Sequence, residues 1–159
     1  MKKLDKAAVL GQSLAPQLSD AALILYVEDD DENWNVAELR LLGSYQLLRA
    51  ADAEQACKLV REHGSNLSAI LMDIELRGSD LNGVELTELF RGKALPRSLP
   101  SYARNFPIVT RPIIFVTAHG ARYSDVELML FGADKVIAKP VDFSALNLAL
   151  AALPARRGS

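Results

Sequence analysis

Residues 21–33 read AALILYVEDDDEN, an apolar run that leads into five consecutive acids, Glu28 to Glu32. The residues from Leu23 to Val27 are apolar without alternation, which predicts a strand that is covered on both faces. Such a strand lies inside a sheet, so the acids that follow it are expected at the sheet's edge. The rest of the chain has to explain why so much negative charge gathers there.

Short apolar segments alternate with segments of helical period from residue 21 onward, which is typical of βαβ units and a parallel sheet. The predicted strands are Leu23 to Val27, Tyr45 to Ala50, Ala69 to Met72, Ile113 to Thr117 and Lys135 to Ala138. Helices are predicted over residues 33–42, from Asp52, over 84–91, from Ser124 and over 143–153. The fold class is therefore α/β, with five strands and five helices.

Several residues predict where the helices begin and end. Asp52 with Gln55 and Ser124 with Glu127 resemble capping boxes, in which side chains bind the free N–H groups of the first turn. Gly64 follows the second helix and suits a left-handed C-cap.

Two segments fall outside this alternation. Residues 1–20 form an N-terminal extension, and residues 92–111 form a long connection with three prolines and four basic residues. We predict a domain over residues 21–154, a tail over 155–159, and either a solvated or a partner-docking role for the 92–111 insertion.

Composition limits the class of protein. The 159 residues, half of them hydrophobic, suffice for one domain with its own core. A net charge of -2 gives no reason to expect nucleic acid or an anionic membrane as partner. Asp5 and Lys6 interrupt the apolar stretch that a signal peptide needs, and no segment approaches the ~20 apolar residues of a membrane span. The lone Cys57 predicts helix packing in a reducing compartment, so a cytoplasmic protein is expected.

Polar residues follow four of the predicted strands. Glu28, Asp29 and Asp30 follow the first strand, Asp73 follows the third, Thr117 closes the fourth and Lys139 follows the fifth. Ligands of open parallel sheets bind beyond the carboxyl ends of the strands, so these residues are expected to meet at one site.

Acids gathered at one edge need a cation or a raised pKa, because two carboxylates ~4 Å apart repel by about 4 kcal/mol at an effective dielectric of 20. Mg²⁺ prefers oxygen ligands, which fits Asp29 and Asp73 with Glu28 in support. A carboxylate beside Mg²⁺ and a lysine can attack a phosphoryl group, so Asp73 is a candidate nucleophile. Asp30 or Asp31 is expected to cap the following helix instead.

Other motifs do not fit. An EF-hand starting at Asp29 fails because Trp34 stands where Gly is needed and Arg40 where Glu is needed. The chain has no Gly-rich phosphate loop. His63 and His119 are too few and too far apart in sequence for a zinc site or a catalytic triad.

The motifs LILYVEDD, AILMDIEL, NGVEL, IIFVTAHG and GADKVIAKP occur in this order between Leu23 and Leu153. Together they resemble the receiver domain of bacterial two-component response regulators. The resemblance implies a flavodoxin-like (CheY-like), doubly wound five-stranded parallel sheet of strand order 2-1-3-4-5, flanked by five helices.

The resemblance also implies a role for individual residues. Asp73 is similar to the phosphoacceptor, Glu28 and Asp29 to the acidic pair that holds Mg²⁺, and Glu75 to the residue whose backbone carbonyl completes the metal site. Thr117 resembles the switch hydroxyl that turns toward the phosphoryl group. Lys139 resembles the lysine that pairs with a phosphoryl oxygen, and the bond before Pro140 is expected to be cis.

The chain departs from the family pattern at several positions. The segment after Asp73, IELRGSDLN, is longer than the usual loop and lacks its proline, so the wall over the site is expected to be reshaped. Val136 stands where many receivers carry Tyr or Phe. Glu75 and His119 sit where family members tune the lifetime of the phosphate.

We therefore expect a phosphoacceptor rather than an enzyme, with Asp73 receiving a phosphoryl group from a sensor histidine kinase or a histidine phosphotransfer protein. Little sequence follows the last helix, so a separate effector is expected. The face built by the helix from Ser124, the strand 135–138 and the helix 143–153 is a candidate homodimer interface. The alternatives are a phosphorylation-independent scaffold and a Mg²⁺-dependent phosphatase.

Overall fold

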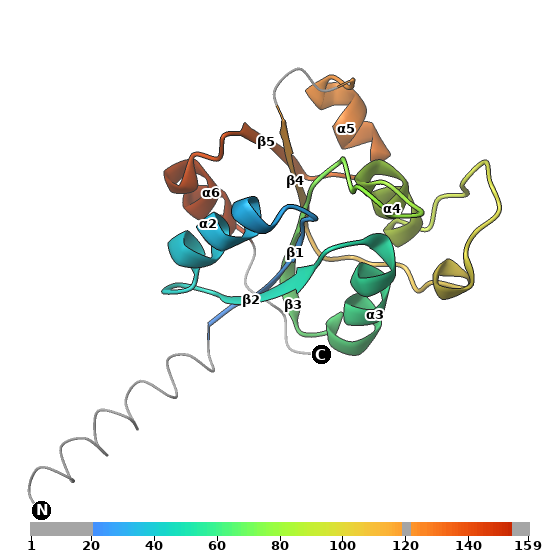
Figure 1. Ribbon diagram of the computed structural model, residues 1–159, viewed down its shortest axis with the longest axis horizontal. Coiled ribbons are helices and arrows are strands. Elements are labelled where there is room, and N and C mark those ends of the chain that lie inside the picture. The colour runs from blue at the N-terminus through green and yellow to red at the C-terminus, as the bar shows by residue number, and fades with distance from the viewer. Residues whose placement is uncertain (1–20, 119–121, 154–159) are drawn as a thin grey trace, which may run out of the picture.

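The apolar run of the opening stretch forms strand β1 (Leu23–Val27), which lies between β2 (Gln46–Ala50) and β3 (Leu67–Met72) in a parallel sheet. Strands β4 (Ile113–Ala118) and β5 (Lys135–Lys139) complete the order β2-β1-β3-β4-β5. The computed structural model describes residues 21–118 and 122–153 (Figure 1). The expected flavodoxin-like topology is confirmed.

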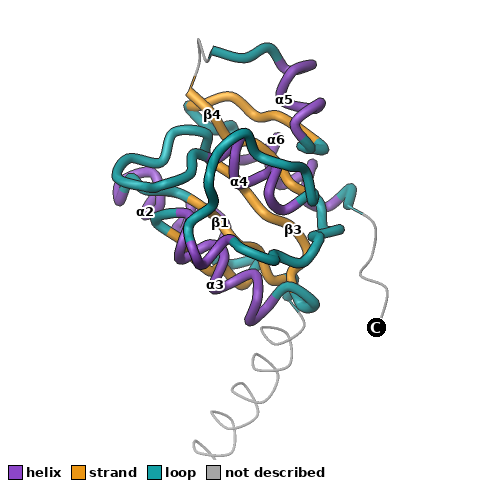
Figure 2. Tube along the Cα trace, turned by 90° about the vertical axis from the view of Figure 1, so that its right-hand side faces the viewer, coloured by secondary structure: helices purple, strands orange, loops and turns teal. Residues whose placement is uncertain are grey.

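Five α-helices of the described residues cover the sheet on both faces. They are α2 (Asp31–Leu41), α3 (Ala53–His63), α4 (Gly83–Phe90), α5 (Asp125–Phe131) and α6 (Phe143–Ala151). In Figure 1, α2 and α6 lie on one side of the sheet and α3, α4 and α5 on the other. Figure 2 shows the strands between these two helical layers.

Each inner strand contributes to two cores. Along β1, Leu25 and Val27 belong to the core beneath α3 and α4, while Ile24 and Tyr26 belong to the core beneath α2 and α6. These four side chains are at most 2% exposed. A strand buried on both faces needs apolar residues at every position, which explains the uninterrupted run in the sequence.

The helix-start predictions are largely confirmed. Asp30 caps α2 by accepting a hydrogen bond from the backbone N–H of Asn33, and Ser124 forms a complete capping box with Glu127. The Asp52 cap on α3 is present, but the Gln55 side chain accepts from the N–H of Ala51 rather than closing the box on Asp52.

One cap prediction is wrong. Gly64 has φ -51° and ψ -40°, a right-handed conformation, and its N–H continues the helical pattern by donating to the carbonyl of Val60. Gly92 after α4 does have a positive φ, of 75°. The sequence pattern therefore located both helix ends but not the conformation of the glycine at the first.

The 92–111 insertion is not simply solvated. It contains the 3-10 helix η1 (Ser101–Ala103), and Ala103 is fully buried in the core shared with α3 and α4. Phe106 stacks on Phe90 of α4 with ring centroids 5.1 Å apart. The solvated alternative is thus wrong for these residues, because apolar side chains spaced along the segment bury against the domain.

Three further expectations concern the chain ends and the backbone. The Lys139–Pro140 bond is cis, as expected. The 1–20 extension, His119 and the 155–159 tail lie outside the described residues. No helix within the described part of the chain is long and apolar enough to cross a membrane.

Candidate functional site

Strand register brings two of the acids together. The parallel pairing of β1 with β3 sets Val27 opposite Met72, so the next residues, Glu28 and Asp73, leave the sheet side by side. The N–H of Asp73 donates to the carbonyl of Val27 over 3.0 Å, which fixes this exit. The site therefore follows from register alone, across more than forty residues of sequence.

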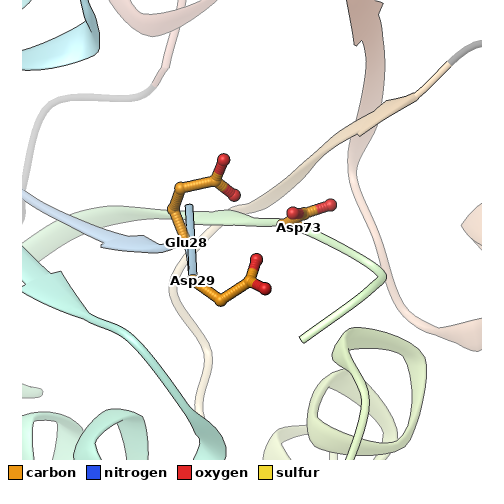
Figure 3. Close-up of side chains that lie close together, drawn as sticks. All are labelled: Glu28, Asp29 and Asp73. Carbon is orange, nitrogen blue, oxygen red and sulfur yellow. The ribbon is translucent and has the colours of Figure 1, made fainter. Parts of the chain in front are cut away.

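Three carboxyl groups gather at these strand ends. Each of Glu28, Asp29 and Asp73 offers an oxygen within 4.8 Å of the other two (Figure 3). Glu28 has no exposed surface, and Asp73 is 7% exposed. Burial weakens solvent screening, so the mutual repulsion of these acids requires a compensating positive charge.

Lys139 supplies part of that charge. From the end of β5 its Nζ donates to Oε1 of Glu28 over 3.0 Å and to Oδ2 of Asp73 over 3.2 Å. Burial alone would lower the pKa of Lys139, but Asp73 and Glu28 together raise it above its ordinary value. Lys139 is therefore a charged bridge between the acid that is most buried and the candidate phosphoacceptor.

One lysine does not balance three acids. Burial, followed by a hydrogen bond and repulsion from Asp73, raises the pKa of Glu28 to about 8 despite the opposing effect of Lys139. The raised pKa reflects the cost of burying a carboxylate beside Asp73, and a bound cation would lower that cost.

The donor set fits Mg²⁺. It is made entirely of oxygen, it is held at the ends of two rigid strands, and it carries more negative charge than Lys139 neutralises. Mg²⁺ sites of this kind use one or two carboxylates together with waters and substrate phosphate oxygens. Glu75 lines the same cavity, so its carbonyl remains a candidate ligand.

Two of the acids, Asp29 and Asp73, line a cavity of about 730 Å³ together with Lys139. Thr117, which is 8% exposed, lines its wall at the end of β4. Arg122 and Tyr123 also line the cavity and were not singled out from the sequence, although they follow the strand that ends in Thr117. The structure thus brings all the predicted side chains to one edge of the sheet, while their chemical roles stay predictions.

Arg77 is a further residue of this site that the sequence did not predict. Its backbone N–H and its Nε both donate to Oδ2 of Asp29, over 3.0 and 3.1 Å. Its Nη2 lies 3.4 Å from Oδ2 of Asp30. Arg77 belongs to the long, proline-free loop after Asp73, so the expected reshaping of this wall takes the form of a cation held over an acid.

Val136 at the usual aromatic position is partly buried and packs against the core beneath α3, α4 and α5. The aromatic pair of this region is instead Tyr123 with Phe131, whose rings meet edge to face at 5.2 Å. Tyr123 also lines the cavity. Val136 is therefore smaller than the Tyr or Phe that many receivers carry at this position, and it has no ring to turn inward.

The sequence of the chain is similar to those of two longer bacterial proteins. The chain is 28% identical over 125 residues to the transcriptional regulatory protein YrkP of Bacillus subtilis, a match over 78% of this chain and 46% of YrkP. It is 28% identical over 128 residues to a protein named as an NtrX-like response regulator in Rickettsia typhi, over 80% of this chain and 23% of that protein. The chain thus spans less than half the length of these relatives.

The fold is shared with solved receiver domains. The crystal structure of the receiver domain of NtrX from Brucella abortus superposes with a TM-score of 0.64 at 22% identity, over 80% of this chain and 94% of that domain. Furthermore, the sequence model of the response regulator receiver domain matches residues 24–151, which hold every residue of the acidic site. The chain therefore belongs to the response regulator receiver domain family.

Proposed function

We propose that this chain is a phosphoacceptor that receives a phosphoryl group on Asp73 and passes the signal to a separate partner. The proposal rests on the contact of Lys139 Nζ with both Glu28 and Asp73, since Lys139 and Asp73 line the cavity. The donor would be a sensor histidine kinase or a histidine phosphotransfer protein, as expected for a receiver.

Asp73 is the nucleophile of the proposed step. An oxygen of its carboxylate forms a bond to phosphorus, the phosphorus–nitrogen bond of the donor breaks, and the electron pair stays on the donor nitrogen. The side chain is held at a strand end yet opens onto the cavity, so a donor can reach it without a backbone rearrangement.

Lys139 and Thr117 act on the oxygens of the transferred group. Lys139 already contacts Asp73, so its ammonium is placed to balance the charge of a phosphoryl oxygen when one arrives. The hydroxyl of Thr117, at the cavity wall, can donate to a second oxygen. Both groups sit near strand ends and line the cavity, so each is placed close to the transferred group.

Asp29 and Asp73, with Glu28 in support and the carbonyl of Glu75, would hold Mg²⁺. When bound, the ion offsets negative charge between the carboxylates and the incoming phosphate. The burial of Glu28 and its raised pKa support this assignment, because both point to a place where a cation is favoured.

The output surface is proposed to be the face of α5, β5 and α6. Apolar side chains on this face remain exposed, namely Val126, Leu130 and Leu148, at 69%, 70% and 73%. Phosphorylation adds roughly two negative charges, which can bias a rearrangement of elements next to Thr117 and Lys139. An effector or a second copy of the chain is the proposed reader of this face.

Intact-mass measurement tests the proposal. The protein is incubated with Mg²⁺ and acetyl phosphate, and one added phosphoryl group is expected on the wild type and none on Asp73→Asn. Omission of Mg²⁺ is expected to reduce the labelling strongly. Equal labelling of Asp73→Asn, or an unlabelled wild type, would contradict the proposal and favour a phosphorylation-independent scaffold.

The same samples examine the phosphatase alternative. A phosphoacceptor of this kind acts only on its own phosphorylation and dephosphorylation, so we expect no steady turnover of p-nitrophenyl phosphate. Turnover abolished by Asp73→Asn would instead assign the site to a phosphatase.

A further inference from the structure

The loop between β3 and α4 places a cation on the acid that the proposed function assigns to Mg²⁺. The guanidinium of Arg77 lies 3.1 Å from Oδ2 of Asp29 and also reaches Asp30. Asp29 is only 10% exposed, whereas the side chain of Arg77 is 79% exposed. A solvent-exposed cation therefore contacts a largely buried metal-ligand candidate.

The backbone and the side chain of Arg77 make separate contacts with Asp29. The backbone N–H holds Oδ2 at 3.0 Å, so the orientation of the carboxylate does not depend on the guanidinium. What the guanidinium adds is a positive charge next to a site that needs a positive ion. Two cations that share one carboxylate oppose each other, and each weakens the binding of the other.

The loop can release the guanidinium without moving. Ser79 accepts a hydrogen bond from the N–H of Ala53 and donates to the carbonyl of Leu81, and Arg97 of the insertion donates to the carbonyl of Asp80. These contacts hold the backbone after Gly78, whose φ of 73° makes the turn. The exposed side chain of Arg77 is thus the part of this wall that is free to exchange with another cation.

We propose that Arg77 is a built-in competitor of Mg²⁺ at Asp29, which lowers the metal affinity of the site below that of its acids alone. The inference rests on the proposed function, because it takes Asp29 as a Mg²⁺ ligand. In the metal-free protein the guanidinium covers Asp29, and Mg²⁺ binding displaces it toward Asp30 and solvent. The residue thereby sets the Mg²⁺ concentration at which the site becomes ready for phosphoryl transfer.

Calorimetric titration of the metal-free full chain with MgCl₂ tests this directly, without a phosphoryl donor. Arg77→Gln is expected to lower the Kd for Mg²⁺ by roughly three- to tenfold at low salt, because a single charge close to a divalent ion in a mostly aqueous setting is worth about that much. The gain is expected to shrink at about 1 M salt, where screening shortens the reach of the charge.

Two variants serve as controls. Arg77→Lys keeps the charge and is expected to stay within about twofold of the wild type. Arg104→Gln removes another exposed arginine, whose Nε donates to the carbonyl of Leu99 outside the cavity lining, and is expected to leave the Kd unchanged.

An unchanged or higher Kd for Arg77→Gln would overturn the inference, since a higher value would make Arg77 a positioning residue for Asp29. If the wild type is labelled on Asp73 in a Mg²⁺-dependent way while Arg77→Gln binds Mg²⁺ no more tightly, the inference alone fails. If neither protein binds Mg²⁺ and the wild type is not labelled, the proposed function fails and takes the inference with it.

Discussion

Charged residues have different roles at the acidic site and around the 92–111 insertion. At the site, Lys139 contacts Glu28 and Asp73 while Arg77 contacts Asp29, so three acids face two cations. The insertion is instead held from outside by guanidinium groups that bind its backbone carbonyls: Arg61 of α3 donates to the carbonyls of Tyr102 and Arg104, and Arg91 after α4 donates to those of Val109 and Arg111. The first arrangement leaves charge uncompensated, and the second uses charge to hold a loop.

The difference teaches how to separate a functional charge from a structural one. A guanidinium that binds carbonyls satisfies groups that would otherwise be costly to bury, and it needs no further partner. A buried carboxylate with too few cations is unfavourable until a ligand arrives. The sequence left the insertion as either solvated or partner-docking, yet two of its basic residues, Arg97 and Arg111, donate to the backbone carbonyls of Asp80 and Ser65 and so help to hold the loop in place.

The largest effect is predicted for the removal of Lys139, the cation that contacts Asp73. Lys139→Ala is expected to slow labelling of Asp73 by about 100- to 1,000-fold, because removing one group that stabilises developing charge has an effect of that size in enzyme active sites. Arg61→Ala is the matched variant, which removes a guanidinium of α3 that holds the insertion, and it is expected to lower stability without changing the labelling rate. Labelling rates of both variants are measured by intact mass, and circular dichroism checks that each variant is folded. Equal slowing by both variants would erase the distinction between the two regions.

The next effect concerns the backbone of the site. A Cβ added to Gly83 would lie 1.9 Å from the carbonyl oxygen of Asp73, so the start of α4 cannot accept a side chain without moving the strand end. Gly83→Ala is expected to reduce the free energy of unfolding by about 3 kcal/mol, at the upper end of typical overpacking. Gly43→Ala, with nothing within 4 Å of its Cβ, is expected to change it by less than about 0.5 kcal/mol. Urea unfolding at constant m-value measures both, and similar losses would refute the close-approach explanation.

The fold was predictable because its signals are local. All five strands and the helices with two predicted ends lie within two residues of their predicted bounds, since burial on both faces and helix caps act over a few residues. The strand order came from the family resemblance. Gly64 shows the limit, because a glycine after a helix permits a left-handed turn without requiring one.

The site was predictable only in part, for a related reason. Residues at strand ends converge in any sheet of this topology, so Asp29, Asp73 and Lys139 could be grouped without knowing side-chain positions. Arg77 could not, because its pairing with Asp29 spans 48 residues and depends on the path of an unusual loop. The burial of Phe106 was not predicted either, since the apolar residues of this proline-rich segment follow neither a helical nor a strand period.

Phe106 offers the matching test on the side of the insertion. Its ring stacks on Phe90, and the guanidinium of Arg61 lies 4.5 Å from its centroid. Phe106→Ala is expected to cost about 2 kcal/mol of unfolding free energy, less than a fully buried phenylalanine, because the ring is partly exposed. Ile108→Ala, at a side chain 69% exposed, is expected to cost far less. Labelling of Asp73 is expected to stay within twofold of wild type for both, and a tenfold loss for Phe106→Ala would couple the insertion to the chemistry.

The smallest predicted effect concerns Asn82, a residue with two possible roles, one in the cavity and one as a helix cap. Asn82 lines the cavity, yet its side chain also accepts from the N–H of Glu85 and completes the capping box of α4. If its role is structural, Asn82→Ala should lower the unfolding free energy by about 1 kcal/mol, and Asn82→Ser should restore most of it, because serine caps helices nearly as well. The labelling rate at saturating Mg²⁺ should then change less than twofold in either variant. If Asn82→Ala instead loses most of its labelling, and the stable Asn82→Ser loses it as well, the amide of Asn82 contacts the phosphoryl donor. Asn82 would then both cap the helix and belong to the site.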